Sequence, residues 1–169
     1  EWKTQTFHNL AHVGVKLVIT NSAINKVLGE PLHLAKVRLG SHLIQEILKT
    51  SELFRPEDVI GSINEVAFLQ FSSGTTGHSK AVTITHKNAL ANADAIMRGL
   101  NHDPKSSRAV SWLPLYHDMG LIGAFITPIF SSTPLYIMNP EHFIAEPMNW
   151  LKLISKVRAN ITVAPNFAY

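Results

Sequence analysis

The chain has 169 residues, of which 46% are hydrophobic and 16% are charged, with nine glycines and nine prolines. This composition is typical of a folded globular domain, or of part of one, and it excludes a mainly disordered chain. The formal net charge is +3, and because the basic residues are scattered along the chain, a nucleic-acid-binding surface is not expected. The absence of cysteine excludes disulfides, cysteine-bearing zinc sites and thiol nucleophiles.

No segment of the sequence is expected to cross a membrane or to act as a targeting peptide. The most apolar stretch, residues 120–130, is too short to span a bilayer. The first residues form neither an apolar signal core nor an arginine-rich transit pattern. Because the chain has no cysteine, the sequence leaves the compartment open but favours a cytoplasmic location. Since the sequence begins without methionine and its ends carry no capping pattern, we expect a segment of a longer protein.

The first third of the chain predicts a helix, a strand and a second helix. A β-branched run at residues 17–20 follows an amphipathic stretch, and Asn21 then offers a helix cap. Leucine and isoleucine at helical spacing predict a packed helix over residues 41–49. Proline, glycine and acidic residues predict a connecting loop from residue 50 to residue 62.

One pair of histidines in this part of the chain has a spacing that metal sites use. His8 and His12 are four residues apart and would share a face of the first helix. No third ligand follows at zinc-site spacing, and no glutamate stands between them. A metal site is therefore not expected there, and the residues that would bind a metal in this protein are unknown from the sequence.

The middle of the chain predicts two strands around a short polar loop. Residues 66–71 are almost continuously apolar, and residues 81–85 alternate between apolar and threonine side chains. A helix over residues 88–100 should follow, with Thr85 or His86 as its cap. The residues expected on the buried face of this helix are Leu90, Ala93, Met97 and Leu100.

After residue 108, predicted strands and helices alternate. This order favours an α/β fold with a parallel or mixed sheet covered by helices. Ligands of such sheets bind where strands end, so the loops carry the function. Trp150, Leu151, Ile154 and Val157 are expected to form the buried stripe of the last helix. The predicted elements are a strand at 109–113, a helix at 119–130, a strand at 135–138, a helix at 147–157 and a strand at 161–164.

The polar loop between the two middle strands is rich in groups that bind phosphate. Glycines allow backbone N–H groups to converge, hydroxyls add donors, and a terminal lysine supplies positive charge. An exposed Ser/Thr/Gly turn would have a similar composition, so the residues alone leave both interpretations open. The loop is not a Walker A motif, and no GxGxxG occurs in the chain. Its candidate phosphate-binding residues are Ser72, Ser73, Gly74, Thr75, Thr76, Gly77 and Lys80.

A second candidate site follows the strand at 109–113. His117 and Asp118 stand between this strand and a predicted helix start, where an acceptor, a donor and backbone N–H groups could gather. A hydrogen-bonded structural turn is the alternative interpretation. Met119, Leu121 and Ile122 could line an apolar ligand channel or pack in the core, and the sequence does not separate these two roles.

Three ordered blocks resemble one known family. Residues 71–88, FSSGTTGHSKAVTITHKN, resemble the phosphate-loop signature TSG[ST]TGxPKGV of the adenylate-forming enzyme superfamily, with Ser79 in place of proline and Ala81 in place of glycine. Residues 112–123, WLPLYHDMGLIG, resemble a stretch typical of fatty acyl-AMP ligases. Residues 143–169 resemble the FxxxPxxWLxxIS and PNFAY segments of the same subfamily.

The resemblance implies that residues 1–169 are part of the large N-terminal AMP-binding domain of a fatty acyl-AMP ligase-like enzyme, without its C-terminal domain. It implies activation of a fatty acid by ATP with Mg²⁺, with Lys80 and the loop on the phosphates and His117 near the adenylate. The acyl group would pass to an acyl carrier protein, or to coenzyme A as in acyl-CoA synthetases. Two rival hypotheses are a non-catalytic nucleotide-binding scaffold and an unrelated nucleotide hydrolase.

Overall fold

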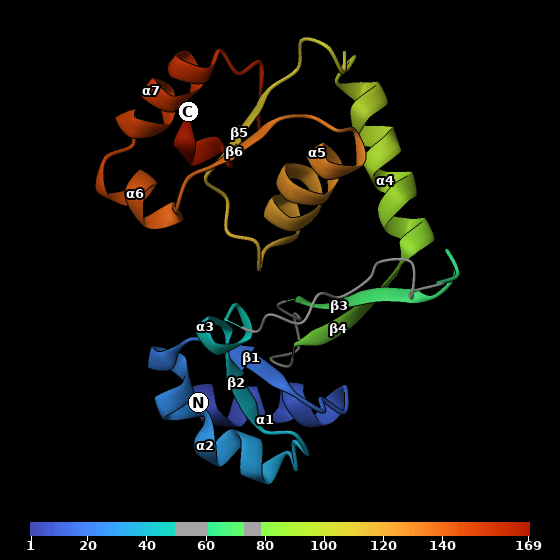
Figure 1. Ribbon diagram of the computed structural model, residues 1–169, viewed down its shortest axis with the longest axis vertical. Helices are drawn as coiled ribbons and strands as arrows, with labels where there is room; N and C mark the ends of the chain where they lie inside the picture. Colours follow the sequence, from blue (N-terminus) through green and yellow to red (C-terminus); the bar gives the residue numbers. More distant parts are fainter. Residues whose placement is uncertain (50–60, 73–78) are drawn as a thin grey trace. The chain divides into compact units, whose positions relative to one another are not determined.

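The computed structural model describes residues 1–49, 61–72 and 79–169 (Figure 1). Contacts divide the chain into two compact units. The first contains Glu1–Gly61 and Phe71–Thr83, and the second contains Ser62–Gln70 and Ile84–Tyr169. Most of the loop predicted over residues 50–62 lies outside the described residues. Within the described part of the chain, no helix has both the length and the apolar character needed to cross a bilayer.

The first unit opens with the predicted helix, strand and helix. These elements are α1 (Trp2–His12), β1 (Val18–Thr20) and α2 (Ser22–Leu34). The Asn21 side chain accepts a hydrogen bond from the Ile24 N–H at 2.9 Å, so it caps α2 as predicted. Helices α1 and α2 pack against each other.

The helix predicted over residues 41–49 is partly wrong. Its first three residues form β2 (Ser41–Leu43), and only α3 (Ile44–Ile47) is helical. Strand β2 pairs in parallel with β1, with Val18 opposite Ser41 and Thr20 opposite Leu43. Pairing with β1, more than twenty residues earlier in the chain, provides hydrogen-bond partners for the backbone of residues 41–43. This pairing outweighs the helical preference that their apolar spacing predicts.

Two paired strands, β3 (Val66–Ser72) and β4 (Lys80–Thr85), correspond to the two strands predicted in the middle of the chain. Helix α4 (His86–Gly99) follows directly. Thr85 caps it, because its hydroxyl accepts from the Asn88 N–H while the Asn88 side chain accepts from the Thr85 N–H. This reciprocal capping box fixes the start of the helix.

The buried face of α4 differs in part from the predicted one. Ala89 and Ala93 are buried, whereas Leu90 and Leu100 are exposed. Small side chains on the buried face let α4 lie close to the helical segments that it contacts, η2 (Met119–Ile126) and α5 (Thr127–Phe130).

The second unit is built on a three-stranded parallel sheet, which confirms the predicted α/β fold. Its strands are β5 (Ala109–Ser111), β6 (Leu135–Ile137) and β7 (Ile161–Thr162), in the order β6-β5-β7. Ala109 lies opposite Leu135 on one side and Ile161 on the other. All three residues of β5 are buried, as expected for a central parallel strand with helices on both faces.

Helices cover both faces of this sheet (Figure 1). Helix α7 (Met148–Val157) contacts β5 and also packs on α6 (Pro140–Ala145), while η2 contacts β5 separately. In Figure 1, β5 and β6 run between the α6–α7 pair and the η2–α5 segment, with α4 outside the latter. Helix α6 is not among the predicted elements, although the Asn139 side chain caps it by accepting from the Glu141 N–H.

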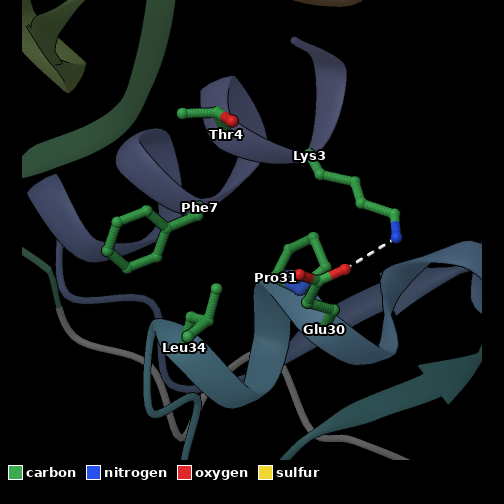
Figure 2. A pocket seen from close by; sticks show the side chains of 6 residues that line it. All are labelled: Lys3, Thr4, Phe7, Glu30, Pro31 and Leu34. Carbon is green, nitrogen blue, oxygen red and sulfur yellow. Dashed lines mark hydrogen bonds and ion pairs between the residues drawn. The ribbon is translucent and has the colours of Figure 1, made fainter.

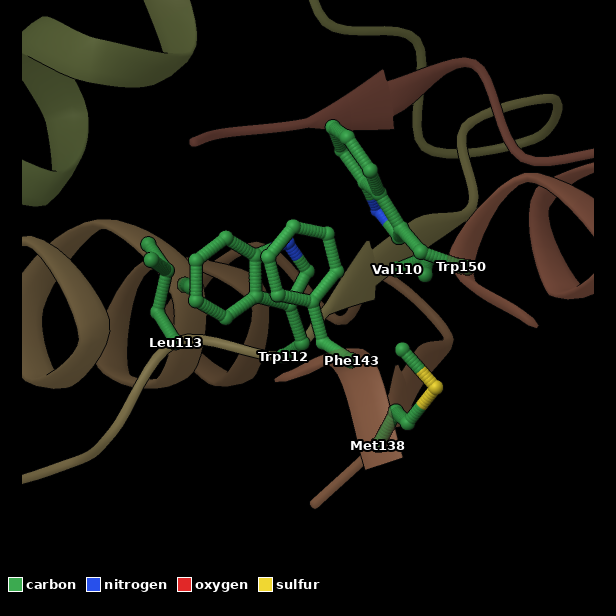
Figure 3. Packing of buried hydrophobic residues seen from close by; sticks show 7 residues of the cluster. Val110, Trp112, Leu113, Met138, Phe143 and Trp150 are labelled. Atoms are coloured by element: carbon green, nitrogen blue, oxygen red, sulfur yellow. The ribbon is translucent and has the colours of Figure 1, made fainter. Parts of the chain in front are cut away.

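Aromatic rings fill the core between the sheet and the α6–α7 pair, as Figure 3 shows. Trp112 stacks on Phe143 with ring centroids 3.8 Å apart, and Trp150 meets the edge of both rings. Each such pair contributes about 0.5–1.5 kcal/mol beyond the burial of its area. Trp150 lies on the predicted stripe of α7, but Leu151 is exposed and Leu153 packs against the core instead.

Candidate functional site

The described ends of the phosphate loop lie on the paired strands β3 and β4. Ser72 is the last residue of β3 and Lys80 is the first residue of β4, and both are exposed. The other predicted phosphate-binding residues, Ser73, Gly74, Thr75, Thr76 and Gly77, lie outside the described residues. The strand pairing therefore fixes the backbone of β3 and β4, which end and begin at these two candidate residues.

Lys80 carries a charge that no described side chain neutralises. The ion pairs within residues 1–49, 61–72 and 79–169 do not include this lysine. A solvated ammonium that is not committed to a carboxylate remains available to an anionic ligand. This state suits the predicted role of Lys80 as a phosphate-binding cation.

A side chain of helix α1 forms a hydrogen bond with Ser79, the residue before Lys80. The Gln5 amide donates to Ser79 Oγ at 3.0 Å and to Asn9 Oδ1 at 2.9 Å. Sequence reasoning missed Gln5, because it lies 74 residues from Ser79 and its own neighbours carry no signal of the contact.

The candidate site in the second unit is a tight turn after β5. The His117 N–H donates to the Pro114 carbonyl at 3.2 Å, and the Leu121 N–H donates to the His117 carbonyl at 2.8 Å. Gly120 is buried directly beneath Pro114, so that a Cβ atom at this position would collide with the Pro114 carbonyl oxygen. The turn therefore requires glycine at residue 120, and it fixes the backbone on both sides of His117.

Asp118 orients the His117 ring. Asp118 Oδ1 lies 2.8 Å from His117 Nδ1 and accepts the Met119 N–H at 2.7 Å. The same N–H is 3.3 Å from Nδ1, and we assign a proton to Nδ1, where it is donated to the closer Asp118 carboxylate. The exposed Nε2 atom is then an acceptor when the ring is neutral and a donor when it is protonated. This geometry suits Asp118 to brace the His117 ring.

A second hydrogen bond ties this turn to β3. The Gln70 side chain donates to the Tyr116 carbonyl at 3.2 Å, directly before His117. Gln70 is two residues before Ser72 in β3. Sequence reasoning missed Gln70 because the bond joins residues 46 positions apart.

The helical segment after the turn begins as a π-helix. Residues Met119–Ile126 are π-helical, and Thr127 Oγ1 donates to the Ile122 carbonyl at 2.7 Å. The predicted helix over 119–130 is thus present, but its first eight residues form a π-helix instead of an α-helix. Short π-helical segments are often found at functional sites. Leu121 and Ile122 are half-buried, and Met119 is more exposed.

The first unit also has a small pocket between α1 and α2, shown in Figure 2. Lys3 Nζ lies 2.6 Å from Glu30 Oε2 at its edge, and the hydrogen bond and charge of Lys3 hold the pKa of Glu30 below its ordinary value. None of the predicted site residues lines this pocket. Its cation is already paired, so it is a poor candidate for a phosphate site.

Within the described residues, no group of three or more histidine, aspartate or glutamate side chains could hold a metal ion. His8 and His12 both lie on α1. The predicted site residues that are described divide between the units. Ser72 and Lys80 belong to the first unit, and His117 belongs to the second.

Comparisons with known proteins agree with this arrangement of elements. The medium-chain-fatty-acid–[acyl-carrier-protein] ligase TtuA of Teredinibacter turnerae is 36% identical over 177 residues, which cover 96% of this chain and 27% of TtuA. A structure from a study of fatty acyl-adenylate ligases of E. coli and L. pneumophila matches with a TM-score of 0.85 and 32% identity, over 99% of this chain and 30% of that chain.

A fatty acyl-adenylate ligase from L. pneumophila, solved in complex with acyl adenylate and pyrophosphate, matches with a TM-score of 0.80 and 32% identity. The match covers 99% of this chain and 28% of that chain. The chain thus spans only about a quarter of the length of the curated relatives that it matches. The family model described as AMP-binding enzyme matches residues 4–169, and the chain therefore belongs to the AMP-binding enzyme family.

Proposed function

We propose that the protein containing this chain activates a fatty acid with ATP. A fatty-acid carboxylate oxygen attacks the α-phosphorus of ATP, the bond to the β-phosphate breaks, and pyrophosphate leaves with the electron pair. The products are an acyl adenylate and pyrophosphate. The observation that carries the proposal is the match, over 99% of the chain, to a ligase solved with these two groups.

In this proposal, residues 1–169 are part of the N-terminal AMP-binding domain, and a C-terminal domain lies elsewhere in the protein. The family match over residues 4–169 and the small share of each relative that the chain covers support this assignment. The adenine-binding and ribose-binding groups would then also lie in the remainder of the protein.

The phosphate loop would hold the leaving pyrophosphate. Lys80 is exposed at the first position of β4 and has no ion pair among the described residues, which supports a role on the phosphate oxygens. Fixed donors of this kind stabilise charge as it moves onto the leaving group. Mg²⁺ would neutralise further charge on the triphosphate. We propose that the rest of the cradle consists of Ser72, Ser73, Gly74, Thr75, Thr76 and Gly77.

His117 would contact the reacting end of the substrate. The side chain is exposed and Asp118 engages Nδ1, so a protonated ring can donate its Nε2–H to an anionic oxygen without losing its orientation. The surface exposure of this pair makes it weak as a source of stability. The geometry of the His117–Asp118 pair is therefore better explained by a role in orienting a substrate than by a role in stability.

The acyl group would next pass to the thiol of an acyl carrier protein. The similarity to TtuA, a ligase named for that acceptor, supports this choice over coenzyme A. Because ATP and an acyl carrier protein would both be required, we propose a cytoplasmic location.

The test is ATP–pyrophosphate exchange by the full-length protein with a panel of fatty acids. Lys80→Ala should lower exchange by about 100-fold or more, because removing a group that stabilises transition-state charge costs about 2.7–4 kcal/mol. Lys152→Ala, which removes a charge from an exposed site on α7, is the matched control and should leave exchange unchanged.

The other outcomes would indicate a different function or exclude a role for Lys80. Exchange without transfer to the carrier protein, but with transfer to coenzyme A, would indicate an acyl-CoA synthetase. No exchange with any acid would favour a non-catalytic scaffold, and phosphate release without added acid would favour a hydrolase. Equal exchange by wild type and Lys80→Ala would remove Lys80 from the mechanism.

A further inference from the structure

The hydrogen bond between α1 and the residue before Lys80 has the features of a structural restraint. Gln5, Asn9 and Ser79 are all partly buried. The Gln5 amide uses one N–H on Asn9, one helical turn away, and the other on Ser79. The bond to Asn9 fixes the Gln5 rotamer in advance, so less entropy is lost when Gln5 holds Ser79.

Ser79 stands where the resembled signature has proline. A proline ring would restrict the backbone covalently at this position. Serine lacks that restriction, but its hydroxyl accepts the Gln5 bond at 3.0 Å. The next residue is Lys80, whose position depends on the backbone that Ser79 anchors.

We propose that Gln5 is a positioning residue that anchors the start of β4 through Ser79 and so places the Lys80 ammonium for the ATP phosphates. Gln5 does not touch the substrate in this account. The inference rests on the proposed function and deepens it, because it assigns to α1 a part in phosphate binding.

The expected effect is the loss of one partly buried hydrogen bond, which corresponds to a change of roughly 2- to 12-fold. The loss should appear in kcat/KM for ATP, while the KM for the fatty acid stays the same. Gln5→Met tests this with similar length and good helix propensity. Ser79→Ala removes the acceptor of the same bond.

The experiment is a double-mutant cycle in the full-length protein, with two measurements. The first is ATP–pyrophosphate exchange, in which Gln5→Met, Ser79→Ala and the double variant should show the same loss. Ser79→Pro, which supplies a covalent restraint, should remove the sensitivity to Gln5→Met. The matched control is Gln45→Met on α3, since Gln45 is exposed and should give no loss.

The second measurement is amide hydrogen exchange of a peptide covering residues 79–85, which does not require turnover. Gln5→Met and Ser79→Ala should speed its exchange equally, and Gln45→Met should not. Additive losses in the cycle, or unchanged amide exchange, would overturn the positioning role. If the wild type shows no acid-dependent exchange, the proposed function fails, and the amide measurement still decides whether Gln5 anchors this segment.

Discussion

Gly120→Ala should damage both stability and activity, because no space exists for its methyl group. The added Cβ would lie 2.9 Å from the Pro114 carbonyl carbon and closer still to its oxygen, whereas ordinary contacts begin at 3.4 Å. The backbone must therefore separate by at least 0.5 Å. Overpacking of this kind costs about 1–3 kcal/mol. The same Pro114 oxygen accepts the His117 N–H, so the displacement reaches the candidate catalytic ring.

Gly123→Ala is the matched control for this substitution. Gly123 lies in the same π-helical segment, but a Cβ atom there would meet no atom within 4 Å. Alanine in a helix is favoured over glycine by about 0.5–1 kcal/mol, so Gly123→Ala should be neutral or stabilising.

The two variants are compared by urea unfolding and by ATP–pyrophosphate exchange in the full-length protein. Gly120→Ala should unfold at lower urea and, because misplacement of a reacting group by 1 Å can cost about 100-fold, should lose on the order of 10-fold in exchange. If Gly120→Ala and Gly123→Ala behave alike in both assays, the close approach of Gly120 to Pro114 does not support the His117 turn.

Two further predictions concern stability. Thr162→Val should destabilise the protein by about 1–3 kcal/mol in urea unfolding, because it leaves the buried Trp150 Nε1–H without its acceptor, the Thr162 hydroxyl at 3.1 Å. Thr162→Ser keeps a hydroxyl and should retain most of the stability. Equal losses in the two variants would contradict this reasoning. Because Lys3 holds the pKa of Glu30 below 4.5, the stability difference between wild type and Glu30→Gln should be constant above about pH 4.5 and disappear as the pH falls through the lowered pKa. Added salt should reduce this difference, and a difference that persists at pH 2 would exclude the ion pair as its source.

Many elements of this protein follow from signals within a few residues of each other. Asn21 caps α2, and Thr85 with Asn88 forms the capping box of α4, so both helix starts were predictable from short-range hydrogen bonding. The apolar runs of β3 and β5 identified strands for the same reason. The candidate residues Ser72, Lys80 and His117 also emerged from local composition and motif resemblance.

Other features required partners that are distant in the sequence. Residues 41–43 became a strand because β1 offered a parallel edge, against their own helical spacing. The close approach of Gly120 to the Pro114 carbonyl, in the π-helical segment after Asp118, likewise joins residues whose contact exists only in the folded chain. Local propensity is overridden wherever pairing or close packing satisfies more of the backbone.

The sequence by itself determined the family resemblance, the α/β class and the candidate phosphate-binding groups. Only the tertiary structure revealed the bonds beside the candidate residues, from Gln5 to Ser79 before Lys80 and from Gln70 to the Tyr116 carbonyl before His117. These bonds join residues 74 and 46 positions apart, and an amide side chain carries no trace of so distant an acceptor in its own neighbourhood. Motifs identify candidate reacting groups because the chemistry of those groups is local, whereas the residues that contact them from a distance depend on contacts that exist only after folding.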